Sequence, residues 1–297
     1  MSGSAVKTAA ENQFETYLRE SGVDGHEDHQ PDLGGGPGAR RPDYRVTRAE
    51  AAAIIELKGF ETSSMEDALA RGGGVVIRDA SQELAPVRNK IGEALKQLRP
   101  YRDRPEPLIV CLANPRRLMV PSESHNDVIA AMYGERGVRV SMVTPENPEP
   151  SDDPEWFLGR NGVFGGGLHP YVSAVMTLHE RTYRDEAIER WHQDIKERLA
   201  GVEDRQERIS LTYEATREPA FAEADATPGT YRFVRVFETH HVGATAPPVP
   251  RDLFTGPRDE FRAYNPENGC LELLRPPGRR DAPDERRGSS REAERGR

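Results

Sequence analysis

Residues 41–60, RPDYRVTRAEAAAIIELKGF, decide the fold of this chain. Two stretches, 44–47 and 52–60, are rich in β-branched and other apolar residues. A polar turn at 48–50 separates them, and this arrangement predicts a β-hairpin whose second strand ends in IIELKGF.

The hairpin gathers charged side chains at one place. Side chains alternate along a strand, so Glu56 and Lys58 share a face while Ile55 and Leu57 point to the opposite one. Asp43 stands at the start of the neighbouring strand, and a hairpin of this length can bring it beside Glu56. The sequence therefore predicts two carboxylates and an ammonium at one end of a sheet.

The segments around the hairpin predict an α/β core. Apolar residues recur at helical spacing before it and again in 87–101, and the continuous apolar run PLIVCLA is typical of a buried strand. The expected elements are a helix at 10–21, strands at 23–29, 44–47 and 52–60, a helix at 87–101, a strand at 107–113, a helix at 122–133 and a strand at 138–143. The core order is helix, three strands, helix, strand, around a mixed central sheet.

The rest of the chain predicts an extension and a tail. PENPEPSDDPE at 145–155 is a Pro- and Asp-rich link. We therefore expect a core over 1–145, an α+β extension over 146–274 that packs on it, and a disordered Arg-rich tail over 275–297. In the extension, the pattern favours a strand at 171–179, a helix at 183–199 and a strand at 231–239.

Composition narrows the class of protein. The apolar runs are far shorter than the ~20 residues that a membrane helix needs, and the N-terminus lacks the apolar region of a signal peptide, so we expect a cytoplasmic protein. Cys111 and Cys270 form no CxxC pair, which argues against a zinc site or a disulfide framework. The net charge of −9 argues against a general nucleic-acid coat, although one cleft can differ in sign from the whole protein.

The charged cluster has a clear chemical use. Hydrolysis of a phosphodiester requires neutralisation of the phosphoryl centre and a nucleophile made from water. Carboxylate oxygens from Asp43 and Glu56 suit Mg²⁺ or Mn²⁺, which keep several waters and can bridge to a phosphate. Lys58 would supply a compact positive charge beside the attacking water and the scissile phosphate.

Pro42-Asp43 followed by Glu56-Leu57-Lys58 resembles the motif of the PD-(D/E)xK nuclease superfamily, whose core is restriction-endonuclease-like. The resemblance covers about residues 10–143. It implies a metal-dependent nuclease, with DNA as the expected substrate, acting in restriction, phage defence or repair. RNA cleavage and a homodimer stay open, and no membrane partner is expected.

The resemblance also implies further site residues. Gln97 and Tyr101 form a Q-x-x-x-Y pattern like the helix motif of one large branch of the superfamily. Gln97 would orient a metal-bound water or a phosphate, and Lys90, two turns earlier on that helix, would contact the DNA backbone. The remaining candidates are a metal-binding acid on the first helix, which is Glu11 or Glu15, and the substrate-binding residues Tyr101 and Arg41.

Plainer interpretations compete with these. Asp43, Glu56 and Lys58 could form a solvated hairpin edge, and Gln97 with Tyr101 a packing pair at a helix end. The rival function is a catalytically inactive nuclease fold that binds nucleic acid or a partner protein. Intact Asp43, Glu56 and Lys58 favour the enzyme.

Overall fold

A computed structural model describes residues 7–23, 26–28, 33, 40–62, 83–118, 120, 122, 124–139, 155–158, 161–165, 168–239, 246–265 and 270–274. Its helices are α1 (Ala9–Glu20), α4 (Ala85–Leu98), the 3-10 turn η1 (Arg99–Tyr101), α5 (His125–Tyr133), α6 (Tyr183–Arg198), α7 (Arg205–Ala215) and α8 (Pro219–Ala226). Its strands are β1 (His26–Asp28), β2 (Tyr44–Arg48), β3 (Ala51–Gly59), β4 (Leu108–Ala113), β5 (Arg136–Arg139), β6 (Glu155–Leu158), β7 (Ala174–Thr182), β8 (Thr230–Glu238), β9 (Glu260–Asn265) and β10 (Cys270–Leu274).

The α/β class with a mixed sheet is confirmed. Described elements from α1 to β4 run helix, three strands, helix, strand, which is the order that the sequence predicts. β2 and β3 pair antiparallel across a two-residue turn, in which Ala49 adopts a left-handed backbone with φ of 48°. Residues 145–154 of the predicted link and the tail over 275–297 lie outside the described residues.

One eight-stranded sheet organises the molecule, in the order β1-β2-β3-β4-β7-β8-β9-β10. β3, β4 and β7 are parallel neighbours at its centre, and the outer pairs β1–β2, β2–β3, β7–β8 and β9–β10 are antiparallel. Every residue of β4 is buried, because helices and loops cover both faces of this central strand. Burial on both faces explains why its sequence is continuously apolar rather than alternating.

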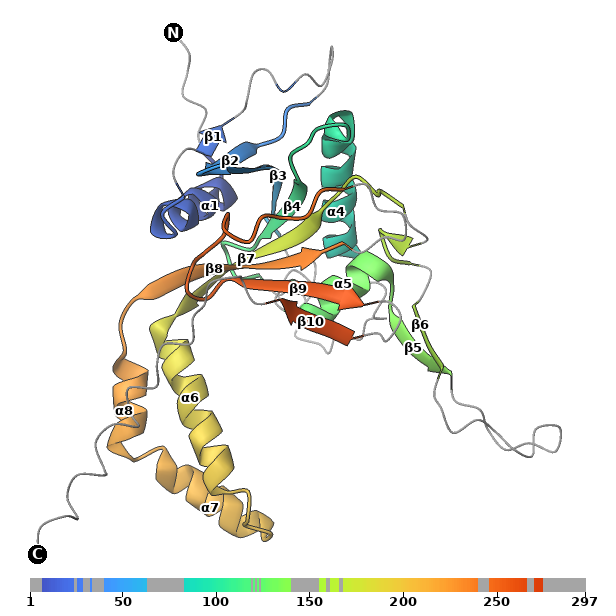
Figure 1. Cartoon of the computed structure of the whole chain (residues 1–297). Coiled ribbons are helices and arrows are strands. Elements are labelled where there is room, and N and C mark those ends of the chain that lie inside the picture. The colour runs from blue at the N-terminus through green and yellow to red at the C-terminus, as the bar shows by residue number, and fades with distance from the viewer. Residues whose placement is uncertain are drawn as a thin grey trace, which may run out of the picture.

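Two hydrophobic cores lie on opposite faces of the sheet (Figure 1). α4 and α5 cover one face, where Ile54 and Val110 point. α1 covers the other with Phe14 and Tyr17, against Ile55. The alternation along β3 therefore places Glu56 and Lys58, which share the face of Ile54, on the α4 side.

Strands β7 to β10 continue the same sheet as the N-terminal strands instead of forming one of their own. β7 pairs with β4, and the phenolic hydroxyl of Tyr17 in α1 donates to Asp259 Oδ2 at 2.8 Å. The segment expected at 138–143 begins earlier, as β5, and pairs with β6 in a separate two-stranded ribbon.

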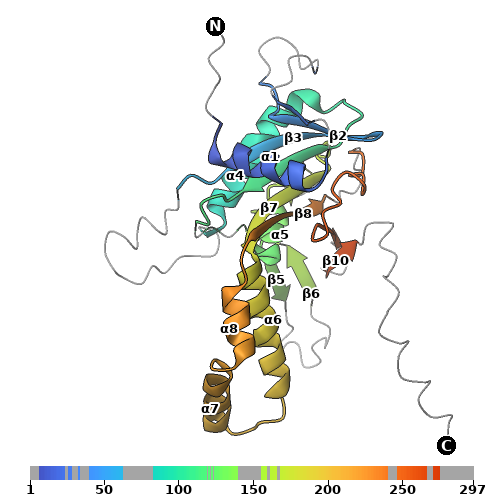
Figure 2. The same cartoon turned by 90° about the vertical axis from the view of Figure 1, so that its left-hand side faces the viewer.

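Three helices project from the body of the protein. α6 leaves β7, α7 follows it, and α8 returns to β8, so together they form a helical arm (Figures 1 and 2). Trp191, Ile195 and Ala215 form the small core of this arm. The sequence analysis predicts α6 but neither α7 nor α8. No helix in the described part of the chain combines the length and apolar character needed to cross a membrane.

Candidate active site

The β2–β3 hairpin sets Asp43 beside Glu56. Tyr44 lies opposite Ile55 in the antiparallel register, so the next position along sets Asp43 opposite Glu56. Asp43 Oδ2 also accepts a hydrogen bond of 2.8 Å from the backbone N–H of Leu57. This bond fixes the carboxylate of Asp43 against β3, one residue after Glu56.

Lys58 links the hairpin to helix α4. Its ammonium donates to Glu56 Oε1 at 2.6 Å and also to Gln97 Oε1. Gln97 lies in the last turn of α4, which packs on β3. The Lys58 side chain is 16% exposed and that of Glu56 is 0% exposed, so the ammonium stands between the buried acid and solvent. A solvated hairpin edge is therefore wrong for Glu56.

The electrostatics of Glu56 are unusual for an acid. Burial raises its pKa from 4.5 to about 7, and the negative charge of Asp43 adds to the rise, whereas Lys58 opposes it. Glu56 Oε2 is buried and accepts no hydrogen bond from the described residues. An unsatisfied buried polar atom costs about 1–3 kcal/mol. A cation or a hydrogen-bond donor at this oxygen would remove that cost.

Two adjacent carboxylates fit a magnesium-type cation. Within the described residues, no group of three His, Cys, Asp or Glu side chains could by itself hold a metal. Mg²⁺ does not need such a group, because it commonly binds through one or two carboxylates and keeps several waters. Asp43 and Glu56 offer hard oxygen donors, and Glu56 Oε2 accepts no hydrogen bond from the described residues, so this pair fits Mg²⁺ or Mn²⁺.

The two acids of α1 have other partners. Glu11 forms a capping box, in which its side chain accepts from the backbone N–H of Thr8 at 2.6 Å. Glu15 accepts from Lys7 Nζ at 2.6 Å and from the Tyr44 hydroxyl at 3.4 Å. Neither acid contacts Glu56 or Lys58 through a hydrogen bond or ion pair that the structure describes, because α1 packs on the opposite face of β3.

Of the remaining predicted residues, Tyr101 and Arg41 interact with the cluster or the segment beside it, whereas Lys90 has another partner. Tyr101 is buried, and its hydroxyl donates to the carbonyl of Arg40 at 3.1 Å, which holds the segment leading into Asp43. Burial and the charge of Glu56 raise the pKa of Tyr101, whereas the charge of the exposed Arg41 lowers it. Tyr101 therefore lies close enough to Arg41 and Glu56 to interact with both electrostatically. Lys90 instead pairs with Glu93 at 3.7 Å, one turn along α4.

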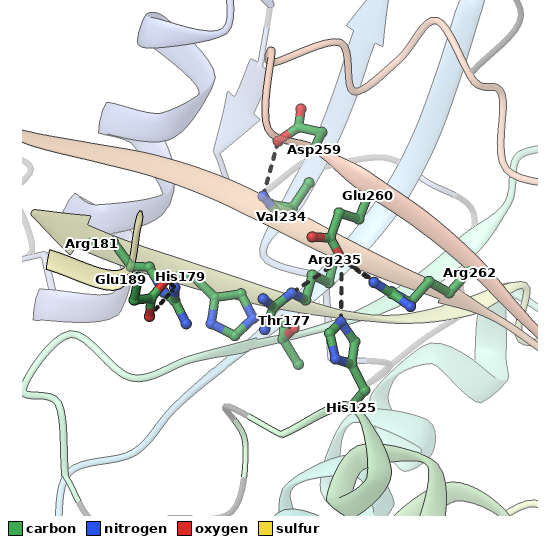
Figure 3. Close-up of polar contacts among 10 residues, drawn as sticks. All are labelled: His125, Thr177, His179, Arg181, Glu189, Val234, Arg235, Asp259, Glu260 and Arg262. Atoms are coloured by element: carbon green, nitrogen blue, oxygen red, sulfur yellow. Dashed lines mark hydrogen bonds and ion pairs between the residues drawn. The ribbon is translucent and has the colours of Figure 1, made fainter. Parts of the chain in front are cut away.

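A second polar cluster is not predicted from the sequence. Glu260 Oε2 lies 3.2 Å from His125 Nε2, 3.3 Å from Arg235 Nε and 2.9 Å from Arg262 Nη2 (Figure 3). Burial and the charge of Arg235 lower the pKa of His125, and the hydrogen bond to Glu260 opposes this shift. Alternation of Glu260 and Arg262 on one strand is the only local signal; pairing of β8 with β9 adds Arg235, and α5 adds His125.

Comparison with known proteins gives no identity: no family model matches the sequence, and no curated protein or solved structure matches the chain.

Proposed function

We propose that this protein is a metal-dependent nuclease of the PD-(D/E)xK type that hydrolyses phosphodiester bonds in DNA. One observation carries the proposal. A buried Glu56 oxygen without a described partner lies beside Asp43, and the Glu56 carboxylate is bound by the ammonium of Lys58. Such a grouping has little value for stability, because it buries charge at a cost, but it suits a site that holds a cation and a phosphate.

Each residue has a defined role in this proposal. Asp43 and Glu56 would hold Mg²⁺ or Mn²⁺, which would neutralise the phosphate and lower the pKa of a bound water. Lys58 places a positive charge where negative charge builds up on the phosphoryl oxygens. Gln97 acts as a positioning residue, because its amide oxygen accepts a hydrogen bond from Lys58 and fixes the direction of the ammonium.

The surface around the cluster supports a phosphate-rich substrate. Arg40 and Arg41 are exposed immediately before Asp43, and Lys96 and Arg99 are exposed in and just after the last turn of α4, on either side of Gln97. These cations could bind the DNA backbone although the whole chain carries a net charge of −9.

Cleavage assays test the proposal directly. The purified protein should cut at least one member of a panel of duplex, single-stranded, branched and RNA substrates when Mg²⁺ or Mn²⁺ is present, and none in EDTA. Asp43→Asn and Lys58→Ala should abolish that cleavage. Glu61→Gln is the matched control, because Glu61 follows β3 closely but is exposed.

Three outcomes would change the conclusion. Cleavage that survives Asp43→Asn would point to a contaminating nuclease and remove the support for this site. Wild-type protein that binds DNA but cuts no substrate would favour the inactive binding module instead. Cleavage of RNA alone would keep the mechanism and change the substrate.

A further inference from the structure

A hollow with basic residues lies at the end of α4, beyond Gln97 and Tyr101. Its volume is about 470 Å³, and the polar side chains that line it include Arg99, Arg102, His169 and Tyr171. Asp103 also lines it, but this carboxylate is 91% exposed and pairs only loosely with Arg102, at 3.6 Å. The lining therefore carries a net positive charge in a strongly acidic protein.

One part of the lining, formed by His169 and Tyr171 and called the wall below, is held in place by its own contacts. The Tyr171 hydroxyl donates to the Leu95 carbonyl at 3.2 Å, so its oxygen accepts from His169 Nδ1, 3.1 Å away. The His169 ring also packs edge-on against Phe164, with ring centroids 6.2 Å apart. His169 has a left-handed backbone with φ of 58°, a conformation that costs about 1–3 kcal/mol for a residue other than glycine.

The arginines that line the same hollow are available to a ligand. Arg99 is exposed, and its guanidinium has no ion pair or hydrogen bond with any residue that the structure describes. Compensation of the helix dipole could account for one arginine at the end of α4. It does not account for a hollow that places two guanidinium groups beside a histidine and a tyrosine. Guanidinium groups of this kind bind phosphates well, because their fork of N–H donors matches the phosphate oxygens.

The hollow is close enough to the candidate active site for one DNA strand to reach both. Glu56 pairs with Val110, and Val110 with Val175, so Glu56 and β7 are two strands apart, about 10 Å. Tyr171 precedes Val175 by four residues, and because residues 171–173 lie outside β7 this stretch spans at most about 14 Å. A strand in duplex DNA carries a phosphate about every 3.4 Å along the axis, so a few nucleotides span this separation.

We propose that this hollow binds a non-scissile phosphate of the DNA strand whose scissile phosphate lies at Asp43, Glu56 and Lys58. The inference rests on the proposed nuclease function and adds a place where the substrate is held. Arg99 and Arg102 bind the phosphate oxygens, and the His169–Tyr171 pair forms the wall against which the adjoining sugar or base packs.

Binding in EDTA tests the hollow separately from cleavage. Fluorescence anisotropy with a short labelled DNA strand should show roughly tenfold weaker binding for Arg99→Gln/Arg102→Gln than for wild type. The slope of log affinity against log salt should fall by about 0.7–0.9, since the double variant loses the contact with one phosphate. Arg99→Lys/Arg102→Lys should keep most of that slope because it keeps both charges.

The control removes equal charge from a distant surface. Arg190 and Arg208 are exposed on the helical arm, and Arg190→Gln/Arg208→Gln should change the affinity less than twofold. Equal loss in the two double variants, or wild-type protein that does not bind DNA in EDTA, would overturn the inference. If wild-type protein cuts no substrate, and only Arg99→Gln/Arg102→Gln weakens DNA binding, the nuclease function is rejected and the phosphate site is retained.

Discussion

Glu56 is the residue on which stability and function are in greatest conflict. Its carboxyl is fully buried, one of its oxygens has no described partner, and Asp43 repels its charge. An apolar or amide side chain of similar volume would avoid these costs. The conflict is resolved if a cation completes the site, so one prediction concerns the titration of Glu56 and another concerns metal binding.

The first prediction concerns stability against pH. The pKa of Glu56 is about 7 in the folded protein and near 4.5 when unfolded. Between pH 4.5 and 7, the folded state binds more protons than the unfolded state. The free energy of unfolding therefore falls as the pH rises over this range, and levels off above about pH 7. Glu56→Gln should equal wild type at about pH 4, below the unfolded pKa, and exceed it by up to about 3 kcal/mol at about pH 8, in metal-free urea titrations. A wild-type curve parallel to that of Glu56→Gln would contradict the assignment, and Glu61→Gln is the exposed control.

The second prediction concerns metal. A ligand at ten times its Kd stabilises the folded state by about 1.4 kcal/mol, which raises the Tm of a chain of this size by roughly 2–4 °C. Mg²⁺ should raise the Tm of wild type at about pH 8 by this amount, and Asp43→Asn and Glu56→Gln should lose the effect. An equal rise in all three proteins would place the metal elsewhere.

The third prediction separates Lys58 from the carboxylates. Lys58 donates to Glu56 and Gln97 and is not a metal ligand, so Lys58→Ala should abolish cleavage yet keep the Mg²⁺-dependent rise in Tm. Lys58→Arg keeps the charge, but its planar guanidinium is bulkier, and cleavage should fall more than roughly tenfold, about 1.4 kcal/mol of transition-state stabilisation. Full activity in Lys58→Arg would mean that Lys58 provides only background potential.

At the scale of elements, the position of α1 depends on a very close approach to β3. A Cβ on Gly59 would lie 2.8 Å from the Cβ of Ala10, which is too short for two carbon atoms. Gly59→Ala should therefore push α1 outward and destabilise the protein by about 1–3 kcal/mol in urea titrations. Ala10→Gly in the same chain should recover part of that loss, and strict additivity of the two changes would show that they do not interact.

The parts predicted from sequence are those that depend on local pattern. Hairpin register and helix periodicity extend over few residues, so the sequence could place Asp43 opposite Glu56 and a helix carrying Gln97 nearby. It could not show that β7 joins β4, because periodicity defines the buried face of a strand and not its partner. Helices α7 and α8 lack a strong apolar stripe, since only Ala215 and Ala224 are buried in them.

The site shows the same limit. Glu11 and Glu15 were equal candidates from spacing alone, yet Thr8 and Glu11 already form the T-x-x-E pattern of a capping box, a signal that could have been used. The pairing of Glu15 with Lys7 and Tyr44 depends on how α1 sits on the sheet, and no local pattern contains that information.

At the scale of the whole molecule, the helical arm is joined to the sheet through the β7–β8 pair. Thr182 pairs with Thr230 where the arm begins and ends, and the backbone N–H of Tyr183 donates to the Gly229 carbonyl at 3.1 Å. The guanidinium carbon of Arg258 lies 4.2 Å from the centroid of the Tyr231 ring, and this contact stabilises the base of the arm. The small core of the arm is separate from the two large cores on the sheet faces.

This separation makes the arm a unit that can open by itself. Trp191 is 7% exposed and packs edge-on against Phe221 of α8, with centroids 4.8 Å apart. Trp191→Ala removes most of a cluster with few members, and truncation of a buried Trp costs about 3–5 kcal/mol. Hydrogen exchange should therefore become faster in α7 and α8, while the amides of β4 keep their protection, because local and global opening are distinct events. Equal loss of protection in β4 would show instead that the arm and the sheet unfold as one cooperative unit.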